Sequence, residues 1–309
     1  MGPQLHQLEY FVAVAEDRHF TRAAERLHVA QPSVSAQIRQ LERTLGSPLF
    51  HRGPGKVTLT DAGALLLPLA RRALADVAEL VDGVIELDGL RRGRVAIGAT
   101  PSLSTSLLPA ALGRFHRRYP GVALEVTEQG SQPLVAGLES GDLDLALAIL
   151  PLHQPRLESV SLAVEELVVV TAPDHPLATR RRIALDDLRR VPLVMFRDGY
   201  DLKALTRRVC HEAGFEPVVA LEGGEMGGVL ALVAAGLGAA IVPSIVAAAH
   251  PDLHRLRVRS PSLHREIGLV HRGDRALSRA AAALASEITA LLATSGWPSH
   301  PPPGLHVAV

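Results

Sequence analysis

The chain has 309 residues, of which 47% are hydrophobic, and this is enough apolar material for two or three domains with buried cores. Its 32 acidic and 32 basic residues balance, so the whole molecule is not a general binder of polyanions, and any affinity for nucleic acid must come from a local surface. The single cysteine, Cys210, excludes an internal disulfide framework and a cysteine-rich zinc site, and we expect no metal and no cofactor.

The N-terminal segment lacks the features of a signal peptide, because Glu9, Glu16 and Asp17 interrupt its first apolar run. No uncharged apolar stretch reaches about 18 to 20 residues, the length that a membrane-spanning helix needs. We therefore expect a cytoplasmic protein that does not contact a membrane.

Residues 5 to 45 contain three helical patterns. The first covers Leu5–Glu16, and its apolar residues are spaced to pack on the elements that follow. The second covers Thr21–Leu27, with the Thr21 hydroxyl expected as its N-cap, and the third runs from Pro32 to about Leu45. Because only a tight turn fits between the second and the third, this region predicts a helix-turn-helix.

The third helix is expected to have one apolar and one polar face. A stripe for packing comprises Val34, Ile38, Leu41 and Leu45, whereas the opposite face presents Gln31, Ser33, Ser35, Ala36, Gln37, Arg39, Gln40 and Arg43. Small or polar side chains followed one turn later by arginines suit a helix that enters the major groove of DNA. The alternative is an ordinary solvated helix face.

A hairpin is expected after the third helix. Two short extended pieces flank a Gly53-Pro54-Gly55 turn, which is the composition of a wing. Arg52 and Lys56 flank its tip, where they could reach phosphates or a minor groove. The alternative is a solvated hairpin whose cations make no specific contact.

A long helix follows, from the cap residue Thr60 to about Asp88. Almost thirty residues form a helix of about 45 Å, which is too long for a sixty-residue domain to cover. We therefore expect it to join two larger parts and to dimerise, so that two recognition helices can read a two-fold symmetric site. The expected seam has heptad spacing, with Ala70, Val77 and Val84 at one position and Leu66, Ala73, Leu80 and Leu87 at the other.

Together these residues resemble the N-terminal domain of LysR-type transcriptional regulators. The resemblance rests on Leu5-x-x-Leu8-x-x-Phe11, Phe20-Thr21-x-Ala23-Ala24-x-x-Leu27, Ala30-Gln31-Pro32-Ser33-Val34-Ser35-x-Gln37-Ile38-x-x-Leu41-Glu42, Leu45-Gly46, Leu49-Phe50-x-Arg52 and Thr58-Leu59-Thr60-x-Ala62-Gly63. It implies base or nearby backbone contacts for Gln31, Pro32, Ser33, Ser35 and Gln37, phosphate contacts for Thr21, Arg22 and Arg39, and a wing contact for Arg52, to which the hairpin adds Lys56. Ala36 departs from the family, many members of which have a DNA-contacting arginine there.

From residue 91 onward, extended apolar runs alternate with helical patterns, the order expected for α/β packing. A first group has strands over residues 94–99, 122–128, 143–149 and 166–171 and helices over 104–119 and 133–140. A second group has strands over 193–196, 218–221 and 239–242 and helices over 202–213 and 226–235. A strand over 267–271 would return the chain to the first group, before a helix over 277–292.

Two such units joined by two crossings form a cleft. This part resembles the α/β co-inducer domain of LysR-type regulators, which is itself similar to periplasmic solute-binding proteins. The expected domains are an all-α winged helix-turn-helix over residues 1–62, a dimerisation helix over 60–90 and a two-subdomain effector-binding domain over 91–295. Its first subdomain would cover about 93–165 and 272–295, its second about 166–271, and the Pro-rich tail 296–309 is expected to be disordered.

Residues at the ends of the predicted strands are the candidates for contacts with an effector. They are Thr100, Ser102, Gln129, Ile149, Phe196 and Glu222. Thr100-Pro101-Ser102 leads into a helix N-terminus, where hydroxyl and free N–H groups can hold an anion, so an anionic metabolite is the expected class. Alternatively, Thr100 and Ser102 only cap the helix, and Ile149 and Phe196 only fill the core.

Other functions find less support. The sequence has no HExxH, no Gly-x-Ser-x-Gly elbow and no P-loop, so we assign no catalytic residue. A solute-binding transport protein would need a signal sequence. One branch of the resembled family senses peroxide through a disulfide whose other cysteine would lie nine residues before Cys210, where this chain has Asp201. That switch is therefore excluded within one chain, and Cys210 is expected to be a partly buried thiol.

The sequence thus predicts a homodimer or homotetramer that binds double-stranded promoter DNA and a small-molecule co-inducer, with RNA polymerase as a further expected partner. The remaining alternative is a structural DNA-binding protein, which would show neither sequence preference nor a ligand.

Overall fold

The computed structural model describes residues 2–53, 56–85, 93–259, 262–293 and 304–307. Contacts divide the chain into an N-terminal unit, Met1–Leu87 with Glu139–Asp142, and a C-terminal unit that comprises the remainder. Within the described ranges, no helix combines the length and the apolar character required to cross a bilayer.

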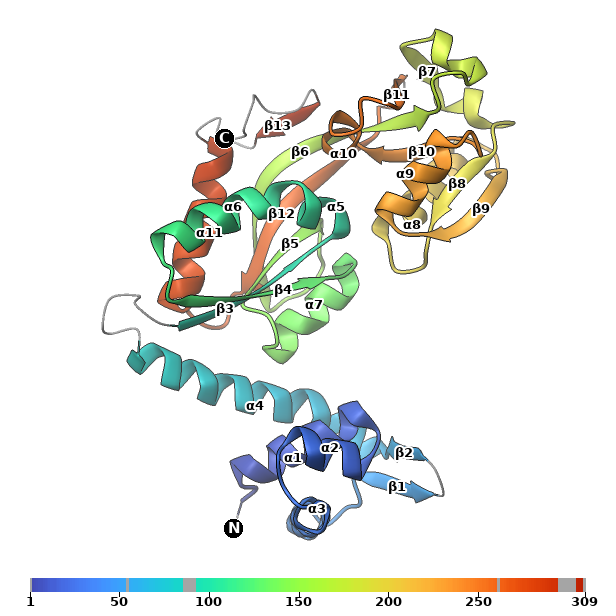
Figure 1. Ribbon diagram of the computed structural model, residues 1–309. Coiled ribbons are helices and arrows are strands. Elements are labelled where there is room, and N and C mark those ends of the chain that lie inside the picture. The colour runs from blue at the N-terminus through green and yellow to red at the C-terminus, as the bar shows by residue number, and fades with distance from the viewer. Residues whose placement is uncertain (1, 54–55, 86–92, 260–261, 294–303, 308–309) are drawn as a thin grey trace. The chain divides into compact units, whose positions relative to one another are not determined.

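The N-terminal unit contains the predicted helix-turn-helix. It consists of α1 (Leu5–Asp17), α2 (Phe20–Arg26), α3 (Gln31–Leu45), β1 (Phe50–Gly53), β2 (Lys56–Leu59) and α4 (Asp61–Ile85) (Figure 1). The apolar stripe of α3 is confirmed for Val34, Ile38 and Leu41, which are fully buried, but not for Leu45, which is 40% exposed at the end of the helix. The predicted N-cap of α2 is wrong. The N-cap residue is His19, not Thr21, and the His19 Nδ1 accepts a hydrogen bond from the Thr21 backbone N–H.

The wing is an antiparallel hairpin in which Arg52 lies opposite Val57. Phe50 begins β1 and is buried, with its ring centroid 5.3 Å from that of Phe11 in α1 and 5.8 Å from that of Phe20 in α2. These aromatic contacts fix the hairpin against the helices. Its position relative to α3 is therefore set by the core of the unit.

The cap of α4 is confirmed, since the Thr60 hydroxyl accepts a hydrogen bond from the Gly63 N–H at 3.1 Å. The predicted heptad seam is only partly correct. Leu66, Ala70 and Ala73 pack into the core of their own unit, because the first half of α4 lies along α1. Of the predicted seam, Leu80 is exposed, as are Leu65 and Leu69, which were not part of it, while the side chains of Val84 and Leu87 lie outside the described residues.

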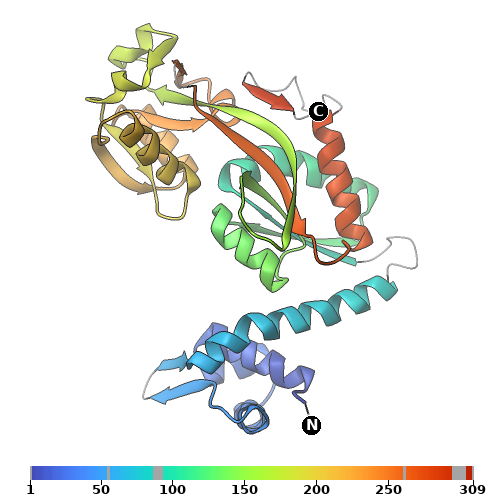
Figure 2. The same ribbon diagram turned by 180° about the vertical axis from the view of Figure 1, so that it is seen from behind.

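The first subdomain of the C-terminal unit is a sheet covered on both faces (Figures 1 and 2). Its elements are β3 (Gly93–Ala99), α5 (Pro101–Thr105), α6 (Leu107–Arg118), β4 (Val122–Glu128), α7 (Ser131–Ser140), β5 (Leu145–Leu150), β12 (His264–Arg272) and α11 (Arg279–Ala293). The strand order is β4-β3-β5-β12-β6. Helices α6 and α11 pack on one core cluster and α7 on the other.

The second subdomain is connected to the first by β6 (Leu157–Thr171) and β12. It contains β7 (Arg182–Ala184), β8 (Leu193–Phe196), α8 (Asp201–Glu212), β9 (Val219–Gly224), α9 (Met226–Ala234), β10 (Ala240–Pro243), α10 (Ser244–Ala248), β11 (His254–Arg259) and short 3-10 helices at Pro176–Thr179 and Leu185–Leu188. Strand β6 pairs with β12 over residues 157–166 and with β10 and β11 over 167–171. It therefore belongs to both subdomains.

The predicted return of the chain to the first group over residues 267–271 is confirmed, since residues 266–270 pair with β5. Two other expectations for the C-terminal unit need correction. Strand β6 begins at Leu157, nine residues before the predicted start at Glu166. In the tail that was expected to be disordered, β13 (Leu305–Val307) pairs with β6, because Leu305 finds a buried place in the first core. Residues 294–303 of the tail lie outside the described ranges.

A buried ion pair ties the two crossing strands together. Arg265 of β12 lies directly opposite Glu165 of β6, and its Nε and Nη2 donate to Glu165 Oε2 at 2.8 and 2.7 Å. The Ile245 backbone N–H donates to the other carboxylate oxygen at 2.8 Å. The two side chains are only 3% and 0% exposed, so each charge depends on the other for its stabilisation.

Removing Arg265 should therefore be costly. We expect Arg265→Ala to lower the free energy of unfolding of the full chain by about 3–5 kcal/mol, because Glu165 would be left buried without a counter-charge. The control is Arg94→Ala, which breaks a two-bond pair with Glu125 whose side chains are 44% and 56% exposed. Such exposed pairs contribute about 0–1 kcal/mol. An equal decrease in the free energy of unfolding of the two variants, measured by urea denaturation, would show that the buried Glu165–Arg265 pair stabilises the protein no more than an exposed pair does.

Candidate functional sites

The first half of α3 gathers four of the predicted DNA-contacting residues on its outer face. Pro32 and Ser33 are exposed, and Gln31 and Ser35 are half-buried. The Gln31 Nε2 donates to the Ser35 Oγ at 2.9 Å, one helical turn away, so the two side chains hold each other in place. The amide of Gln31 and the hydroxyl of Ser35 can both donate and accept hydrogen bonds.

Gln37 is positioned by α1. Its Oε1 accepts a hydrogen bond from Nε2 of the buried Gln7 at 3.0 Å and lies 3.2 Å from the His6 Nε2. Its Nε2 has no hydrogen-bond partner among the described residues and can donate outward. The sequence did not reveal this contact, because it joins residues thirty positions apart.

The basic side chains near α3 differ in how far their charge is already neutralised. Arg26 pairs with Glu16 at 2.9 Å and Asp17 at 3.2 Å, and the Arg22 Nη2 donates to the Asp17 carbonyl oxygen. Arg39 is exposed and forms no ion pair within the described part of the chain. The other cation on α3, Arg43, is also exposed, but its Nη2 donates to the Gln40 Oε1 at 2.6 Å, whereas the Arg39 guanidinium group makes no hydrogen bond within the described residues. Arg39 is therefore the better placed of the two to meet a phosphate.

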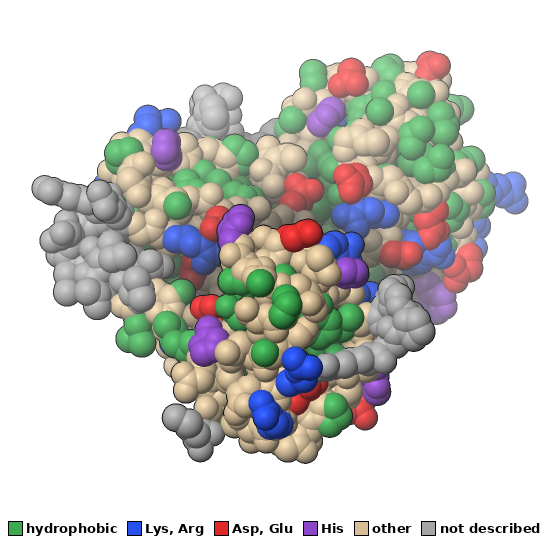
Figure 3. Space-filling model, turned by 60° about the horizontal axis from the view of Figure 1, so that its bottom comes forward, with side chains coloured by type: hydrophobic (Ala, Val, Ile, Leu, Met, Phe, Trp, Pro, Cys, Tyr) green, Lys and Arg blue, Asp and Glu red, His purple; other side chains and the backbone are tan. Residues whose placement is uncertain are grey.

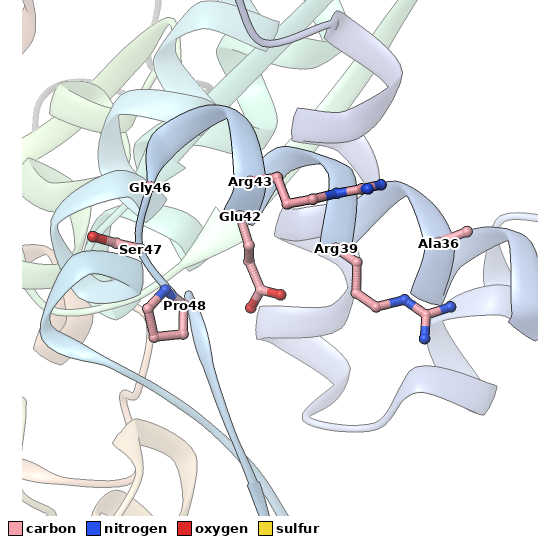
Figure 4. Close-up of a pocket in the computed structure, with 7 residues that line it drawn as sticks. All are labelled: Ala36, Arg39, Glu42, Arg43, Gly46, Ser47 and Pro48. Atoms are coloured by element: carbon pink, nitrogen blue, oxygen red, sulfur yellow. The ribbon is translucent and has the colours of Figure 1, made fainter.

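An open groove of about 690 Å³ runs along the C-terminal half of α3. Figure 4 shows its lining residues, which are Ala36, Arg39, Glu42, Arg43, Gly46, Ser47 and Pro48. Arg39 extends along the helix toward the turn of Ala36, whose methyl group leaves this space open (Figure 4). This placement brings Arg39 toward the position at which Ala36 departs from the resembled family.

The remaining predicted DNA contacts lie on α2 and the wing. Thr21 is exposed on α2. The backbone of Arg52 and Lys56 forms the ends of β1 and β2 next to the hairpin tip, whereas their side chains lie outside the described residues. In Figure 3, which brings the bottom of Figure 1 forward, blue basic side chains stand among tan, uncharged surface on the N-terminal unit.

Three of the six predicted effector residues lie at the ends of adjacent parallel strands, and a fourth, Ser102, lies in the helix that follows the first of them. Thr100 follows β3, Gln129 follows β4, and Ile149 lies near the end of β5. Thr100 and Ser102 are both buried at the start of α5. The Thr100 Oγ1 has no hydrogen-bond partner among the described residues, and a buried hydroxyl without a partner costs free energy that a bound polar ligand would recover.

The structure adds Ser131 and Asp201 to this cluster. Asp201 begins α8 in the second subdomain, and its Oδ2 accepts hydrogen bonds from the Ser131 Oγ at 2.7 Å and the Ser131 N–H at 3.3 Å. The same Oγ accepts from the Ile149 N–H at 3.2 Å. A carboxylate of one subdomain thus lies at the N-terminus of α7 in the other. Close approach requires Gly130, since a Cβ there would meet the Gly199 carbonyl oxygen at 1.9 Å. The signal in the sequence was the position of both polar residues at helix starts.

Phe196 and Glu222 are committed to other contacts. Phe196 is buried in the second core, where its ring stacks on Tyr200 with centroids 5.5 Å apart. Glu222 accepts hydrogen bonds from Lys203 and from Arg207, and these, the Lys203 bond above all, lower the pKa of the carboxyl. Phe196 and Glu222 therefore already have partners within the protein, whereas the Thr100 hydroxyl has none among the described residues.

Cys210 lies in α8 with no exposed surface, so it is more deeply buried than expected. Burial raises the pKa of its thiol to about 11. Very little thiolate therefore exists at neutral pH, and the thiol is a poor nucleophile. Among the described residues, no three His, Cys, Asp or Glu side chains gather to hold a metal ion.

Comparisons with known proteins agree with this arrangement. Residues 5–64 match the family "Bacterial regulatory helix-turn-helix protein, lysR family", and residues 88–293 match "LysR substrate binding domain". A "Hydrogen peroxide-inducible genes activator" of Dickeya chrysanthemi is 35% identical over 241 residues, which cover 78% of this chain and 79% of that protein.

Two solved structures show the same likeness over most of the chain. A full-length OxyR variant from Pseudomonas aeruginosa has a TM-score of 0.72 and 27% identity, covering 92% of this chain and 94% of the other. Full-length CbnR, "complexed with the target DNA", has a TM-score of 0.68 and 28% identity, covering 92% and 98%.

The difference between Arg39 and Arg26 can be measured. We expect Arg39→Ala to weaken binding to duplex DNA and to reduce the slope of log K against log salt by about 0.9 for each lost phosphate contact. Arg26→Ala should leave both nearly unchanged, because Glu16 and Asp17 already balance its charge. Titrations of labelled duplex at several salt concentrations provide the measurement. An unchanged slope in Arg39→Ala would remove Arg39 from the interface.

Proposed function

The chain belongs to the LysR family of transcriptional regulators and is a DNA-binding regulator, and we propose that α3 reads promoter sequence while a ligand in the C-terminal unit modulates binding. The observation that carries the proposal is the outer face of α3. It combines the Gln31–Ser35 pair, the outward Gln37 amide and the unpaired Arg39 on one helix whose other face is buried.

Each proposed DNA contact has a chemical role. Gln31, Ser33, Ser35 and Gln37 can exchange hydrogen bonds with base edges in the major groove, with Pro32 beside them at the start of the helix. The proposed phosphate contacts are Thr21 and Arg22 on α2 and Arg39 on α3. The proposed wing contacts are Arg52 and Lys56. The proposed DNA-binding domain covers residues 1–62.

Members of this family act as oligomers, and we propose that α4 with the linker to residue 90 joins two copies. Leu65 and Leu80 are each 70% exposed, and Leu69 is exposed between them. Exposed leucines along one side of a helix are unfavourable in water, and a second copy would bury them. Pairing would present two α3 helices to a two-fold symmetric site, as a homodimer or within a homotetramer.

The proposed effector is an anion that binds where the two subdomains meet. The carboxylate of Asp201 already occupies the N-terminus of α7 through Ser131, which shows that these donors suit a carboxylate. The buried Thr100 Oγ1 offers a further hydrogen bond. An effector carboxylate would compete with Asp201 for Ser131. It would thereby favour a different arrangement of the subdomains, as a ligand must in order to change the output.

The relative from Dickeya chrysanthemi is named for hydrogen peroxide, whereas this chain has a single cysteine. The position nine residues before Cys210 is Asp201, and the Cys210 thiol is buried with a pKa of about 11. We also propose that the chain has no catalytic activity and acts in the cytoplasm, where bacterial chromosomal DNA lies. RNA polymerase remains an expected partner at the promoter.

Sequence reading by α3 can be tested with Ser35→Ala and Gln37→Ala. Each should reduce the free-energy difference between cognate and mismatched DNA by about 1–3 kcal/mol, because a lost base contact removes discrimination. Thr44→Ala is the matched control, since it removes a hydroxyl from the far end of α3, where Thr44 Oγ1 donates to the Gln40 carbonyl oxygen. Competition binding with duplexes from the region upstream of the gene gives these differences. Unchanged discrimination in both variants would contradict the proposal.

The effector site can be tested with Thr100→Val, which keeps the shape of the side chain and removes the unpartnered hydroxyl. The free protein should be as stable as the wild type or more stable, because no hydrogen bond is lost on folding. Any carboxylate metabolite that raises the melting temperature of the wild type in a screen should raise that of the variant less. An equal rise in both proteins would place the ligand elsewhere.

A further inference from the structure

A cavity of about 460 Å³ lies in the second subdomain and shares no residue with the cluster around Thr100. Its lining includes the apolar side chains of Val168 and Leu253, both buried, and Ser244, which is also buried. Three arginines, Arg181, Arg255 and Arg257, also line it, together with Glu166, Pro251 and His254. We call this the arginine cavity.

The arginines are brought together by the strands. Side chains alternate along β11, with Leu256 and Val258 buried, so Arg255 and Arg257 share its exposed face. The Arg257 backbone N–H donates to the Arg181 carbonyl oxygen at 3.1 Å, which brings the third arginine alongside. The contact between these two segments therefore concentrates positive charge in a chain whose formal net charge is zero.

Only one of the three charges is balanced. The Arg257 Nε and Nη2 donate to the Glu166 carboxylate at 2.6 to 3.0 Å, and this pair is complete. Arg181 and Arg255 form no ion pair with any residue that the structure describes. The cavity therefore carries two uncompensated positive charges beside an apolar floor. Like charges that line one cavity repel one another, and an anion between them would relieve the repulsion.

We propose that the arginine cavity binds a small organic molecule with two negative charges, as a second ligand site separate from the effector site. Guanidinium groups match carboxylate and phosphate oxygens in planar, two-bond geometry. Val168 and Leu253 contact the apolar part of the ligand. The volume of the cavity, about 460 Å³, falls within the usual range for small-molecule sites, about 300–1,000 Å³.

The cavity borders the crossing between the subdomains. Glu166, which lines it, follows Glu165 in β6, and the Ser244 Oγ lies 3.4 Å from the Glu165 Oε1. The Ile245 N–H, next to Ser244, donates to the same oxygen. A ligand against Glu166 and Ser244 thus contacts the residues that surround the Glu165–Arg265 pair. Its binding free energy can bias the arrangement of the crossing strands.

The test is isothermal titration calorimetry of the full-length protein at constant ionic strength. The probes are phthalate, which has two carboxylates on an apolar ring, inorganic pyrophosphate, which has charge alone, and neutral benzamide. We expect one anion to bind per chain and benzamide not to bind. Tighter binding of phthalate assigns the site to dicarboxylates, and tighter binding of pyrophosphate assigns it to phosphate compounds.

Variants locate the site. Arg181→Ala and Arg255→Ala should each weaken anion binding by about tenfold or more, because each removes a charged hydrogen-bond donor. Arg182→Ala is the matched control, since Arg182 is exposed on β7 next to Arg181 but does not line the cavity. It should retain wild-type affinity, as should Thr100→Val. Absence of anion binding, or an equal loss in Arg182→Ala, would overturn the proposal. Loss in Thr100→Val alone would also overturn it, since the anion would then occupy the effector site.

Discussion

The burial of one stripe of α3 determines which of its side chains can meet a partner. Val34, Ile38 and Leu41 are fully buried, and burying an aliphatic side chain of this size stabilises a protein by about 1.5–3 kcal/mol. Rolling α3 to hide its polar face would expose all three. The face with Ser35 and Arg39 is therefore held outward by the core. A rigid helix with a polar outer face is what base recognition requires, because base edges in the groove are read by direct side-chain contact.

In the C-terminal unit, the corresponding constraint lies in the two crossing strands. Strand β6 pairs with β12 in one subdomain and with β10 and β11 in the other, and the buried Glu165–Arg265 pair fixes their register. The two subdomains also meet where the Asp201 carboxylate accepts a hydrogen bond from the Ser131 hydroxyl. Ligands at Thr100 or in the arginine cavity would act on these contacts. Both proposed sites can therefore influence one arrangement of the subdomains from different sides.

The sequence was most informative where local pattern and tertiary packing agree. The helix-turn-helix, the wing and the strands over residues 122–128 and 193–196 follow from periodicity and turn residues, and the structure confirms them. Predictions from the sequence were wrong or missing where contacts between distant parts of the chain determine the structure. Leu66 and Ala70 have heptad spacing, yet α1 occupies their face of α4. Strand β13 forms in a Pro-rich tail because β6 offers a free edge. The Ser131–Asp201 contact joins residues seventy positions apart, which no local pattern encodes.

The claim that α3 lies in the major groove can be tested most directly by DNA cleavage from a single point on its outer face. Because the native Cys210 thiol is buried, an Ala36→Cys variant can be labelled selectively with an iron chelate that cuts nearby DNA. The account predicts two clusters of cuts inside the protected promoter region, related by two-fold symmetry. A complex that forms on the promoter but is cut no more by this label than by the same label in an Arg182→Cys variant would contradict it.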